Sequence, residues 1–321
     1  MQVVIAGGTG QVGTVLARSL HARGAEVTVL GRHPVSLPWR FQTWDGRSLG
    51  DWTRWISGAD IVINLAGRSV NCRYDAANRK EIIDSRVDST RVIGAAIAAA
   101  QHPPPLWLQA STATIYAHRF DAPNDEATGL LGGSEPDGPD TWRFSIEVAR
   151  AWELACDQAS VPQTRKVKMR SAMIMSPDPS GIFATLLGLV RLRLGGSAGS
   201  GRQFVSWIHH QDFIRAIDWL IEHPELAGAV NLAAPNPLPY AEFMRALRSA
   251  AGVSLGLPAT KWMLEIGAFA MRTETELVLK SRRVVPGHLL ESGFAFRHEQ
   301  WPDAANDLCA EWKGREAARS S

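Results

Sequence analysis

The stretch Val3–Gly13 reads VVIAGGTGQVG, a short apolar run that ends in glycines spaced three apart. Apolar residues then recur at helical spacing as far as Leu20, so the stretch predicts a strand, a tight turn and a helix. This arrangement is typical of a dinucleotide site: Gly7 permits the turn, Gly10 lets backbone N–H groups approach a pyrophosphate, and Gly13 lets the helix lie close to the strand. A glycine-rich turn that binds no ligand is the alternative.

The end of the second predicted strand indicates which dinucleotide is bound. Residues 26–30 read EVTVL and lead into Gly31 and Arg32. Sites that prefer NAD place a carboxylate here, about 20 residues beyond the glycines, to accept from the ribose 2′-hydroxyl. Gly31 offers no carboxylate, and the Arg32 guanidinium can pair with a 2′-phosphate. We therefore expect NADP(H) rather than NAD(H); the alternative is that Arg32 is a solvated loop arginine.

Composition and charge exclude several kinds of partner. The 321 residues carry a net charge of +2 with no basic block, so we expect no nucleic acid partner. Three isolated cysteines lack zinc spacing and are typical of a reducing compartment. The chain starts with a strand rather than a signal peptide, and its longest apolar run, 182–190, is too short to span a bilayer. We expect a cytoplasmic protein with a small-molecule substrate and a disordered tail at 313–321.

Strand and helix patterns alternate along the chain as they do in parallel α/β sheets. After the first turn, strands are predicted at 26–30, 39–44, 60–67, 106–111 and 167–175, with helices at 78–100 and 144–158. A strand at 204–208 and a helix at 212–222 follow, and the chain beyond 239 is expected to be helical. The prediction is a Rossmann-type doubly wound parallel sheet with a smaller, mainly helical C-terminal substrate lobe. The nucleotide-binding domain is expected to span 1–175 with 204–234, and the lobe 176–203 with 235–321.

Short motifs along nearly the whole chain resemble the extended short-chain dehydrogenase/reductase superfamily, and more narrowly its atypical branch of epimerase family proteins with a C-terminal domain of unknown function. The glycine turn matches the superfamily as a whole. The narrower resemblance rests on segments 64–67, 79–82, 84–87, 194–196, 199–203, 206–209, 231–237, 285–286 and 293–297. Segments 68–73 and 179–181 depart from the pattern expected of close relatives, in places where substrate is expected to bind.

The resemblance implies a tyrosine and a lysine four residues apart as general acid and base, with a serine or threonine on the fifth strand. Thr112, within the segment Ser111–Tyr116, falls on the hydroxyl position. Aligning the following helix on Glu153 puts Ser145 at the tyrosine position and Ala149 at the lysine position, so the pair is missing. A phenol of ordinary pKa, about 10, needs a cationic neighbour to exchange protons at neutral pH.

We therefore expect slow turnover, with Thr112 orienting a substrate oxygen and Tyr116 or water delivering a proton. The family's structural asparagine is replaced by Arg86, which is either a cation close to the cofactor or part of a salt bridge on the helix surface. The substrate is expected to contact Arg202, Gln203 and His209. The cofactor is expected to contact Gly7, Thr9, Gly10, Gln11, Val12, Gly13, Arg32, Asp45, Leu65, Ala66, Gly67, Arg86 and Ser111.

Two functions from different classes remain open from the sequence. One is an NADP(H)-dependent oxidoreductase or epimerase that uses a nonstandard acid such as Tyr116, Thr112 or His209. The other is an NADP(H)-binding protein that senses redox state or binds a partner protein without turnover. A homodimer is compatible with both. Adjacent histidines on a strand point to opposite faces, so His209 and His210 are expected to form a helix cap with Asp212 and not a metal site.

Overall fold

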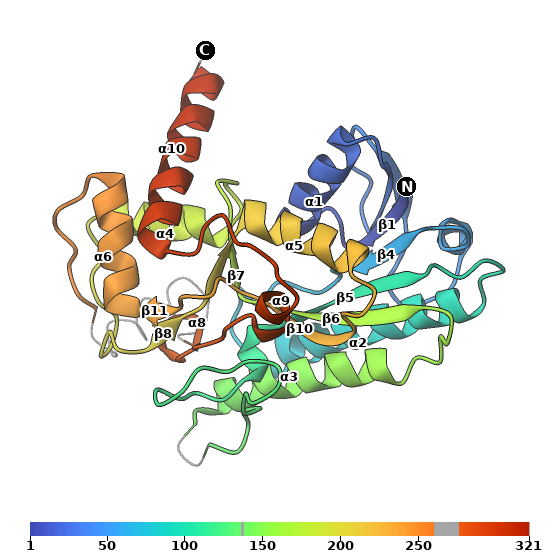
Figure 1. The fold of residues 1–321 in the computed structure, drawn as a ribbon, viewed down its shortest axis with the longest axis horizontal. Helices are drawn as coiled ribbons and strands as arrows, with labels where there is room; N and C mark the ends of the chain where they lie inside the picture. Colours follow the sequence, from blue (N-terminus) through green and yellow to red (C-terminus); the bar gives the residue numbers. More distant parts are fainter. Residues whose placement is uncertain (136–137, 260–275, 321) are drawn as a thin grey trace.

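One parallel sheet forms the centre of the fold. A computed structural model describes residues 1–135, 138–259 and 276–320. Seven strands pair in parallel in the order β10-β6-β5-β4-β1-β2-β3 (Figure 1). Their bounds are β1 Gln2–Ala6, β2 Glu26–Gly31, β3 Arg40–Thr43, β4 Ile61–Asn64, β5 Leu106–Thr112, β6 Arg165–Ser171 and β10 Gly228–Leu232.

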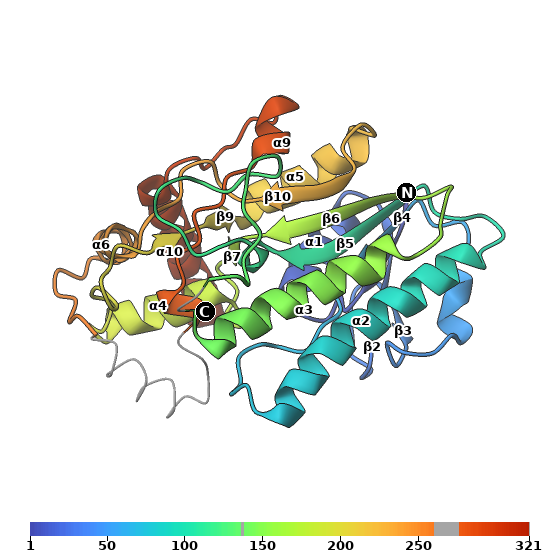
Figure 2. The same ribbon diagram turned by 90° about the horizontal axis from the view of Figure 1, so that it is seen from below.

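Helices cover both faces of the sheet, because parallel neighbours need long crossover connections. On one face lie α1 (Gln11–Ala22) and α5 (His210–Glu222). On the other face, α2 (Ala76–Ala98) and α3 (Asp140–Asp157) lie side by side (Figure 2). Two 3-10 turns complete this part, η1 (Asp51–Trp55) and η2 (Ala113–Ile115). The doubly wound parallel sheet is therefore confirmed.

The central strands are buried on both faces. Ile5 and Ile63 belong to the core under α1 and α5, and Val4 and Val62 belong to the core under α2. All four are at most 2% exposed. This double burial explains why the strand sequences read as continuous apolar runs.

The turn between β1 and α1 needs glycine for two physical reasons. Gly7 has a φ of 72°, which L side chains rarely adopt, and a Cβ there would lie 2.7 Å from the Cα of Ala66. A Cβ at Gly13 would lie 2.4 Å from the Cα of Gly8, so α1 packs directly on the backbone of the turn. The roles expected of Gly7 and Gly13 in the fold are both confirmed.

A second core, mainly helical, lies beside the carboxyl ends of the strands (Figure 1). Its helices α4 (Ile182–Arg191), α6 (Tyr240–Ala251) and α10 (Trp301–Ser320) share one cluster of buried side chains. Two small sheets adjoin it, β7 (Met173–Met175) with β9 (Trp207–His209) and β8 (Phe204–Val205) with β11 (Leu238–Pro239). The helices α8 (Glu276–Leu279) and α9 (Gly287–Glu291) follow.

Three details differ from the sequence-based expectation. The predicted strand 167–175 is broken at Ala172, so that its second half pairs with β9 instead of continuing in the main sheet. The predicted strand 204–208 is broken at Ser206, whose hydroxyl donates to the carbonyl oxygen of Arg282 at 2.6 Å. Leu289 and Phe294 pack into the core of the main sheet, although they fall within the range expected for the lobe.

The tail expected to be disordered is helical, because α10 continues to Ser320. The Arg191 guanidinium makes two hydrogen bonds to the Glu316 carboxylate, at 2.8 and 2.9 Å, and Arg315 bonds to Asp178 at 2.8 Å. Paired bonds of this kind are strong because both partners are charged. They connect the end of α10 to α4 and to the loop after β7, and the composition of the tail alone does not reveal them.

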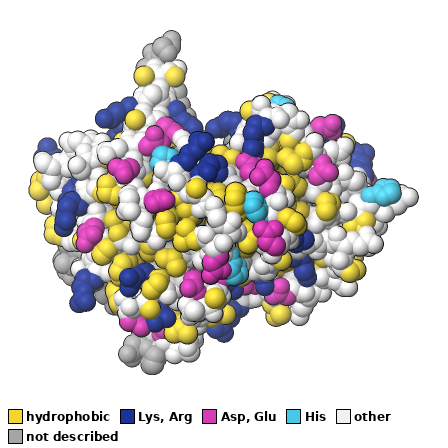
Figure 3. Space-filling model, in the orientation of Figure 1, with side chains coloured by type: hydrophobic (Ala, Val, Ile, Leu, Met, Phe, Trp, Pro, Cys, Tyr) yellow, Lys and Arg dark blue, Asp and Glu magenta, His cyan; other side chains and the backbone are white. Residues whose placement is uncertain are grey.

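Charged side chains of both signs are mixed on the surface. On the face that Figure 3 shows, Lys and Arg side chains alternate with Asp and Glu over the sheet and the helical lobe. This pattern agrees with the small net charge of +2. Within the described residues, no helix has the length and apolar character needed to cross a bilayer.

Replacing Gly13 with alanine is expected to destabilise the protein, because the new Cβ would overlap the Gly8 backbone. Overpacking of this kind typically costs about 1–3 kcal/mol. The matched control is Gly188→Ala in α4, where a Cβ meets nothing within 4 Å. Removing that helix-interior glycine should stabilise the protein by about 0.5–1 kcal/mol. Urea unfolding followed by circular dichroism measures both, and equal effects of the two changes would contradict the close contact at Gly13.

Candidate functional site

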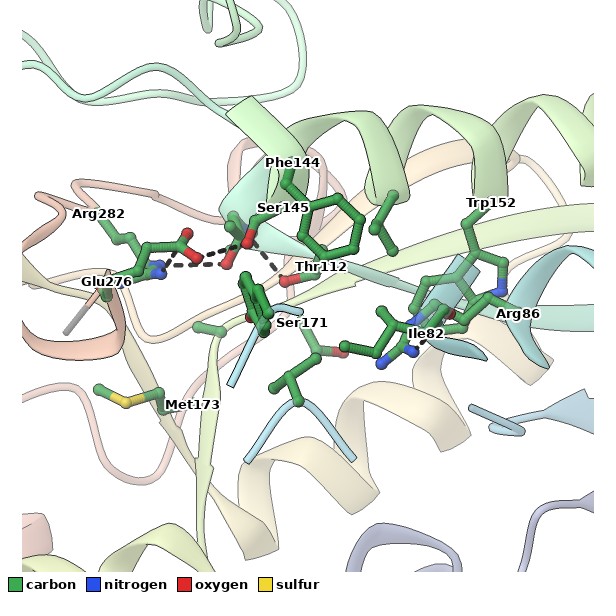
Figure 4. A pocket seen from close by; sticks show the side chains of 16 residues that line it. Ile82, Arg86, Thr112, Phe144, Ser145, Trp152, Ser171, Met173, Glu276 and Arg282 are labelled. Carbon is green, nitrogen blue, oxygen red and sulfur yellow. Dashed lines mark hydrogen bonds and ion pairs between the residues drawn. The ribbon is translucent and has the colours of Figure 1, made fainter. Parts of the chain in front are cut away.

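Two adjoining cavities lie at the carboxyl ends of the parallel strands. The glycine cleft, about 630 Å³, is lined by Gly7, Thr9, Gly10, Gly31, Arg32, Trp44, Asp45, Gly46, Arg47, Leu65, Ala66, Gly67, Arg68, Glu81, Ser85 and Ser89. The inner cavity (Figure 4), about 220 Å³, is lined by Val70, Tyr74, Ile82, Arg86, Thr112, Ala113, Thr114, Phe144, Ser145, Val148, Trp152, Ser171, Ala172, Met173, Glu276 and Arg282.

The glycine cleft has the features of a phosphate-binding site. No side chain caps the first N–H groups of α1, so the positive end of the helix is open to an anion. A Cβ at Gly10 would meet no atom closer than 3.6 Å, which leaves room for a ligand. This donor set suits the pyrophosphate of a dinucleotide.

Most of the expected cofactor contacts line the glycine cleft, namely Gly7, Thr9, Gly10, Arg32, Asp45, Leu65, Ala66 and Gly67. Gln11, Val12 and Gly13 form the first turn of α1 directly after the glycines, and none of the three is among the lining residues. Of the residues that the sequence analysis selected, some line the cleft, and others form the helix turn that follows it.

The residues that the sequence predicts to distinguish a 2′-phosphate from a 2′-hydroxyl, Gly31 and Arg32, line the same cleft. A Cβ at Gly31 would lie 2.8 Å from Cε2 of Phe41, so a carboxylate side chain at this position would require the neighbouring ring to shift. Arg32 is exposed and lines the cleft. Arg47 lines the same cleft and was missed in the sequence, because it stands in a loop with no recognisable motif.

Asp45 stabilises the loop that carries Arg47. Its carboxylate accepts from the backbone N–H groups of Arg47 and Ser48, at 2.8 and 2.9 Å, and from the Ser48 hydroxyl. The Ser48 hydroxyl and these N–H groups lower the pKa of Asp45 to about 2, so the group is ionised at neutral pH. Its place in the cleft suits the expected contact with the adenine amino group, which stays a prediction.

The inner cavity begins at Thr112, the last residue of β5. The Thr112 hydroxyl oxygen accepts from the backbone N–H of Thr114 at 3.2 Å, and no acceptor for its own proton is found in the described part of the chain. Apolar walls that include Ile82, Phe144 and Trp152 surround it (Figure 4). A hydroxyl among apolar walls is suited to hold a carbonyl or alcohol oxygen.

Arg86 lies where the two cavities meet. It lines the inner cavity, and a Cβ at Gly67 in the glycine cleft would lie 3.1 Å from its Cζ. Its Nη1 donates to the carbonyl oxygens of Arg68 and Ile82, both at 3.0 Å, and its guanidinium lies over the Trp152 ring. Burial lowers the pKa of Arg86 to about 10. Within the described residues it pairs with no carboxylate, so the structure does not support a surface salt bridge.

Polar side chains from distant segments meet at the other end of the inner cavity (Figure 4). The Ser145 hydroxyl donates to Glu276, and Nη2 of Arg282 lies 3.3 Å from Oε1 of Glu276. Glu276 is only 1% exposed. Burial and the charge of Glu276 raise the pKa of Tyr74 to about 12. A hydrogen bond with Ser145 lowers this pKa, but its effect is smaller. Tyr74, Glu276 and Arg282 were missed in the sequence because no local pattern brings such distant segments together.

A buried network explains why two of the expected site residues do not face the cavities. Glu153 and Arg170 form an ion pair with two contacts of 2.8 Å. Ser111 donates to Glu153 at 2.6 Å. Arg170 donates to the Tyr116 hydroxyl at 2.9 Å, and this hydroxyl donates to Asn231 at 3.0 Å. Tyr116 is 2% exposed, and neither Ser111 nor Tyr116 lines a cavity. The geometry therefore does not support Ser111 as a cofactor contact or Tyr116 as the proton donor.

The three residues expected to contact substrate also lie outside both cavities. Gln203 is 2% exposed, and its Nε2 donates to the carbonyl oxygen of Ala198 at 2.9 Å. Arg202 is exposed on the same loop, and His209 is fully buried at the start of α5. Gln203 and His209 thus stabilise the local fold, and the expected substrate contact receives no support from the geometry.

His209 belongs to a cluster of imidazole and carboxylate groups. Its ring lies 4.6 Å from that of His210, so the expectation of opposite faces is wrong: β9 ends at His209 and α5 begins at His210. The ring also stacks on His298 at 3.7 Å, and its Nε2 lies 3.2 Å from the Asp307 carboxylate. Because Nδ1 accepts from the N–H of Gln211 and caps α5, Nε2 of the neutral ring carries the proton and offers no lone pair to a metal. The expected helix cap is confirmed at His209.

Two family models match the chain. The model described as the NAD dependent epimerase/dehydratase family matches residues 3–233, which include the seven strands of the main sheet except for Gln2 at the start of β1. A second model, a domain of unknown function (DUF1731), matches residues 259–308. The division between them agrees with the change from the sheet to the mainly helical part of the chain.

Several similar proteins extend over nearly the whole chain. Epimerase family protein SDR39U1 of Bos taurus is 33% identical over 316 residues, which cover 97% of this chain and 100% of that protein. The human protein of the same name is 31% identical over 315 residues, with the same coverage. A crystal structure of human SDR39U1 (isoform 2) with NADPH has a TM-score of 0.82 at 27% identity, over 97% of this chain and 99% of the other.

A UDP-N-acetylglucosamine 4-epimerase from Bacillus cereus shares the fold, with a TM-score of 0.72 at 15% identity over 98% of this chain and 97% of the other. The family model matches most of the sequence, and the relatives are similar over their whole length. Both findings indicate the same family. This chain belongs to the NAD dependent epimerase/dehydratase family, within the extended short-chain dehydrogenases/reductases.

Proposed function

We propose that the protein is an NADP(H)-dependent oxidoreductase or epimerase that acts on a small carbonyl or alcohol substrate in the inner cavity. The observation that carries the proposal is the meeting of the glycine cleft and the inner cavity at Arg86, at the strand ends where doubly wound folds bind ligands. A dinucleotide site thereby adjoins an apolar cavity that contains the Thr112 hydroxyl.

NADP(H) is the proposed cofactor for four reasons. The open N-terminus of α1 suits a pyrophosphate, and Arg32 and Arg47 line the end of the cleft where a 2′-phosphate would need cations. A carboxylate side chain at position 31 would require the Phe41 ring to shift. The similar human protein was crystallised with NADPH. When bound, this cofactor supplies or accepts a hydride.

The chain's own residues then have distinct roles. Thr112 holds the substrate oxygen through its hydroxyl proton. Arg86 supplies a fixed cation where cofactor and substrate would meet. Ile82, Phe144 and Trp152 keep water from the reacting groups, which strengthens every hydrogen bond made inside the cavity.

A second candidate function is an NADP(H)-binding sensor without turnover. It is favoured by the expected lack of the superfamily's tyrosine and lysine, whose positions the alignment on Glu153 assigns to Ser145 and Ala149. Ala149 is fully buried in an apolar cluster with Ala113 and Ile115, so a lysine at this position would lose its hydration without gaining a partner. Restoring the usual pair in full is therefore a poor test, and the substrate experiments below separate the two functions instead.

Arg32→Ala is expected to weaken NADPH binding about 10- to 100-fold and to leave NADH binding nearly unchanged. The loss corresponds to one charge-assisted contact of about 1.5–3 kcal/mol. Isothermal titration calorimetry with both cofactors measures it. The matched control is Arg91→Ala, an exposed arginine on α2 that lines neither cavity, and its NADPH affinity should equal that of wild type. Equal losses for NADPH and NADH would show that Arg32 does not bind the 2′-phosphate.

Thr112→Val should lower kcat/KM for carbonyl reduction by about 10²–10³, as the loss of one hydrogen-bond donor to a developing oxyanion does. NADPH oxidation with a panel of aldehydes and ketones measures the rate. Thr185→Val, an exposed threonine on α4 outside both cavities, is the control and should leave the rate unchanged. Tight NADPH binding by wild type without oxidation by any panel member would favour the sensor over the oxidoreductase.

A further inference from the structure

We propose that Tyr74 is the proton donor of the inner cavity. Three positioning residues, Ser145, Glu276 and Arg282, hold its hydroxyl there. This inference rests on the proposed function, because it assigns the general acid for the same carbonyl substrate. It places the phenol on a different segment from the one that carries it elsewhere in the superfamily.

The backbone and the ring of Tyr74 are both fixed. The next residue, Asp75, caps α2 by accepting from the backbone N–H of Asn78. The Tyr74 ring packs edge-on against Phe144 of α3, with ring centroids 5.0 Å apart and an angle of 68° between the planes. Aromatic pairs in this arrangement are favourable beyond their buried area. Tyr74 and Phe144 both line the inner cavity, so the phenol is presented to it by packing against α3.

The Tyr74 hydroxyl is hydrogen-bonded to the side chain at the superfamily's tyrosine position. That side chain is Ser145, which follows Phe144 on α3 and lines the same cavity. A serine is too short to bring its own hydroxyl where a tyrosine would, and Tyr74 supplies a phenol beside it. The Ser145 hydroxyl donates to Glu276, so this serine links the Tyr74 hydroxyl to the buried carboxylate.

Glu276 and Arg282 connect this hydroxyl to the segment that carries Thr112. Arg282 lies 3.3 Å from the Glu276 carboxylate, and its Nε donates to the Thr114 hydroxyl at 3.1 Å. The backbone of Thr114 in turn donates to Thr112 at 3.2 Å. Linked networks of buried hydrogen bonds restrict the orientation of each member. The network therefore holds Tyr74 and Thr112, the two hydroxyls proposed to contact substrate, in a fixed relation.

The other ionisable groups that line the inner cavity do not suit the role of acid. Arg86 and Arg282 keep their protons at neutral pH. The Glu276 carboxylate accepts hydrogen bonds from Ser145 and Arg282, so its oxygens are bonded to side chains of the protein. Tyr116 is buried in the network of Glu153 and lines neither cavity. Among the described lining residues, Tyr74 is the phenol with access to the substrate space.

The environment of Tyr74 makes it a donor and a poor base. With a pKa raised to about 12 by burial and by Glu276, the phenol stays protonated at neutral pH. It can still protonate an alkoxide, which is a stronger base than a phenolate. The same shift leaves almost no phenolate to remove a proton from an alcohol. The site is therefore built for carbonyl reduction more than for alcohol oxidation.

The proposed step balances as follows. A C–H bond of the reduced nicotinamide breaks, its hydride forms a new C–H bond at the carbonyl carbon, and the cofactor is oxidised. The π electrons of the carbonyl move to its oxygen, which takes the proton of Tyr74 while Thr112 donates a hydrogen bond. The Tyr74 phenolate regains a proton from solvent before the next turnover.

Tyr74→Phe tests the assignment, because it removes the hydroxyl and keeps the packing on Phe144. We expect kcat with panel carbonyls to fall about 10²–10⁴-fold, as the loss of a positioned acid does. KM and NADPH affinity should stay within about twofold of wild type. Tyr240→Phe is the matched control, since Tyr240 is a buried tyrosine of α6 outside both cavities, and its kcat should be that of wild type.

Two further measurements separate proton donation from a structural role. The double variant Tyr74→Phe with Ser145→Tyr places a phenol at the superfamily position. Its kcat should be at least about tenfold higher than that of Tyr74→Phe alone. The infrared C=O stretch of the best panel ketone, bound together with NADP⁺ so that no hydride can move, should lie at lower frequency in wild type than in Tyr74→Phe. Ser145→Ala should lower kcat by a smaller factor and leave KM unchanged.

The outcomes distinguish this inference from the proposed function. If wild type turns over and the Tyr74→Phe variant keeps more than half of its kcat, the assignment of Tyr74 is overturned. The proposal that the protein is an oxidoreductase then still stands. If kcat falls strongly in Tyr116→Phe and not in Tyr74→Phe, Tyr116 is the proton donor instead. An absence of turnover by wild type with every carbonyl would overturn both proposals.

Discussion

The buried ion pair between Glu153 and Arg170 is the interaction on which the site end of the sheet depends. It joins α3 to β6, reaches β5 through Ser111, and reaches β10 through Tyr116 and Asn231. Although burial opposes ionisation, Arg170 and Ser111 keep the pKa of Glu153 below its usual value. Removing either charge would leave the other buried without its partner, which typically costs about 3–5 kcal/mol. The four elements are therefore held together where the cavity begins.

This network also divides β5 into two chemical faces. Successive side chains of a strand point to opposite sides, so Ser111 bonds to Glu153 while its neighbour Thr112 lines the inner cavity. Ser111 of β5 and Arg170 of β6 both bond to Glu153 of α3, so these polar groups stabilise the fold. On β5 and β6, the hydroxyls that line the inner cavity are those of Thr112 and Ser171. Tyr74, which precedes α2, adds the phenol proposed as the acid, and Glu276 of α8 accepts from Ser145 beside it.

The sequence was most informative where a local pattern has one physical solution. The glycine turn and the apolar strands predicted the sheet and the cleft, because φ at Gly7 and the contact at Gly13 permit few alternatives. The inner cavity could not be predicted in the same way, since Glu276 and Arg282 meet Ser145 only through tertiary packing. Tyr116 was a reasonable candidate from its place after β5, but burial and the bond to Asn231 are not visible in a linear pattern.

The backbone of Gly31 lies against the Phe41 ring, so the side chains that fit at these two positions depend on each other. An aspartate at 31 alone would meet the Phe41 ring before it could reach a ribose hydroxyl, since even a Cβ would lie 2.8 Å from Cε2. A smaller residue at 41 would first have to open the space, and on its own it would leave a cavity beside β2 and a less stable sheet. Packing, independently of any charge on the cofactor, thus makes the residue that position 31 accepts depend on the residue at position 41.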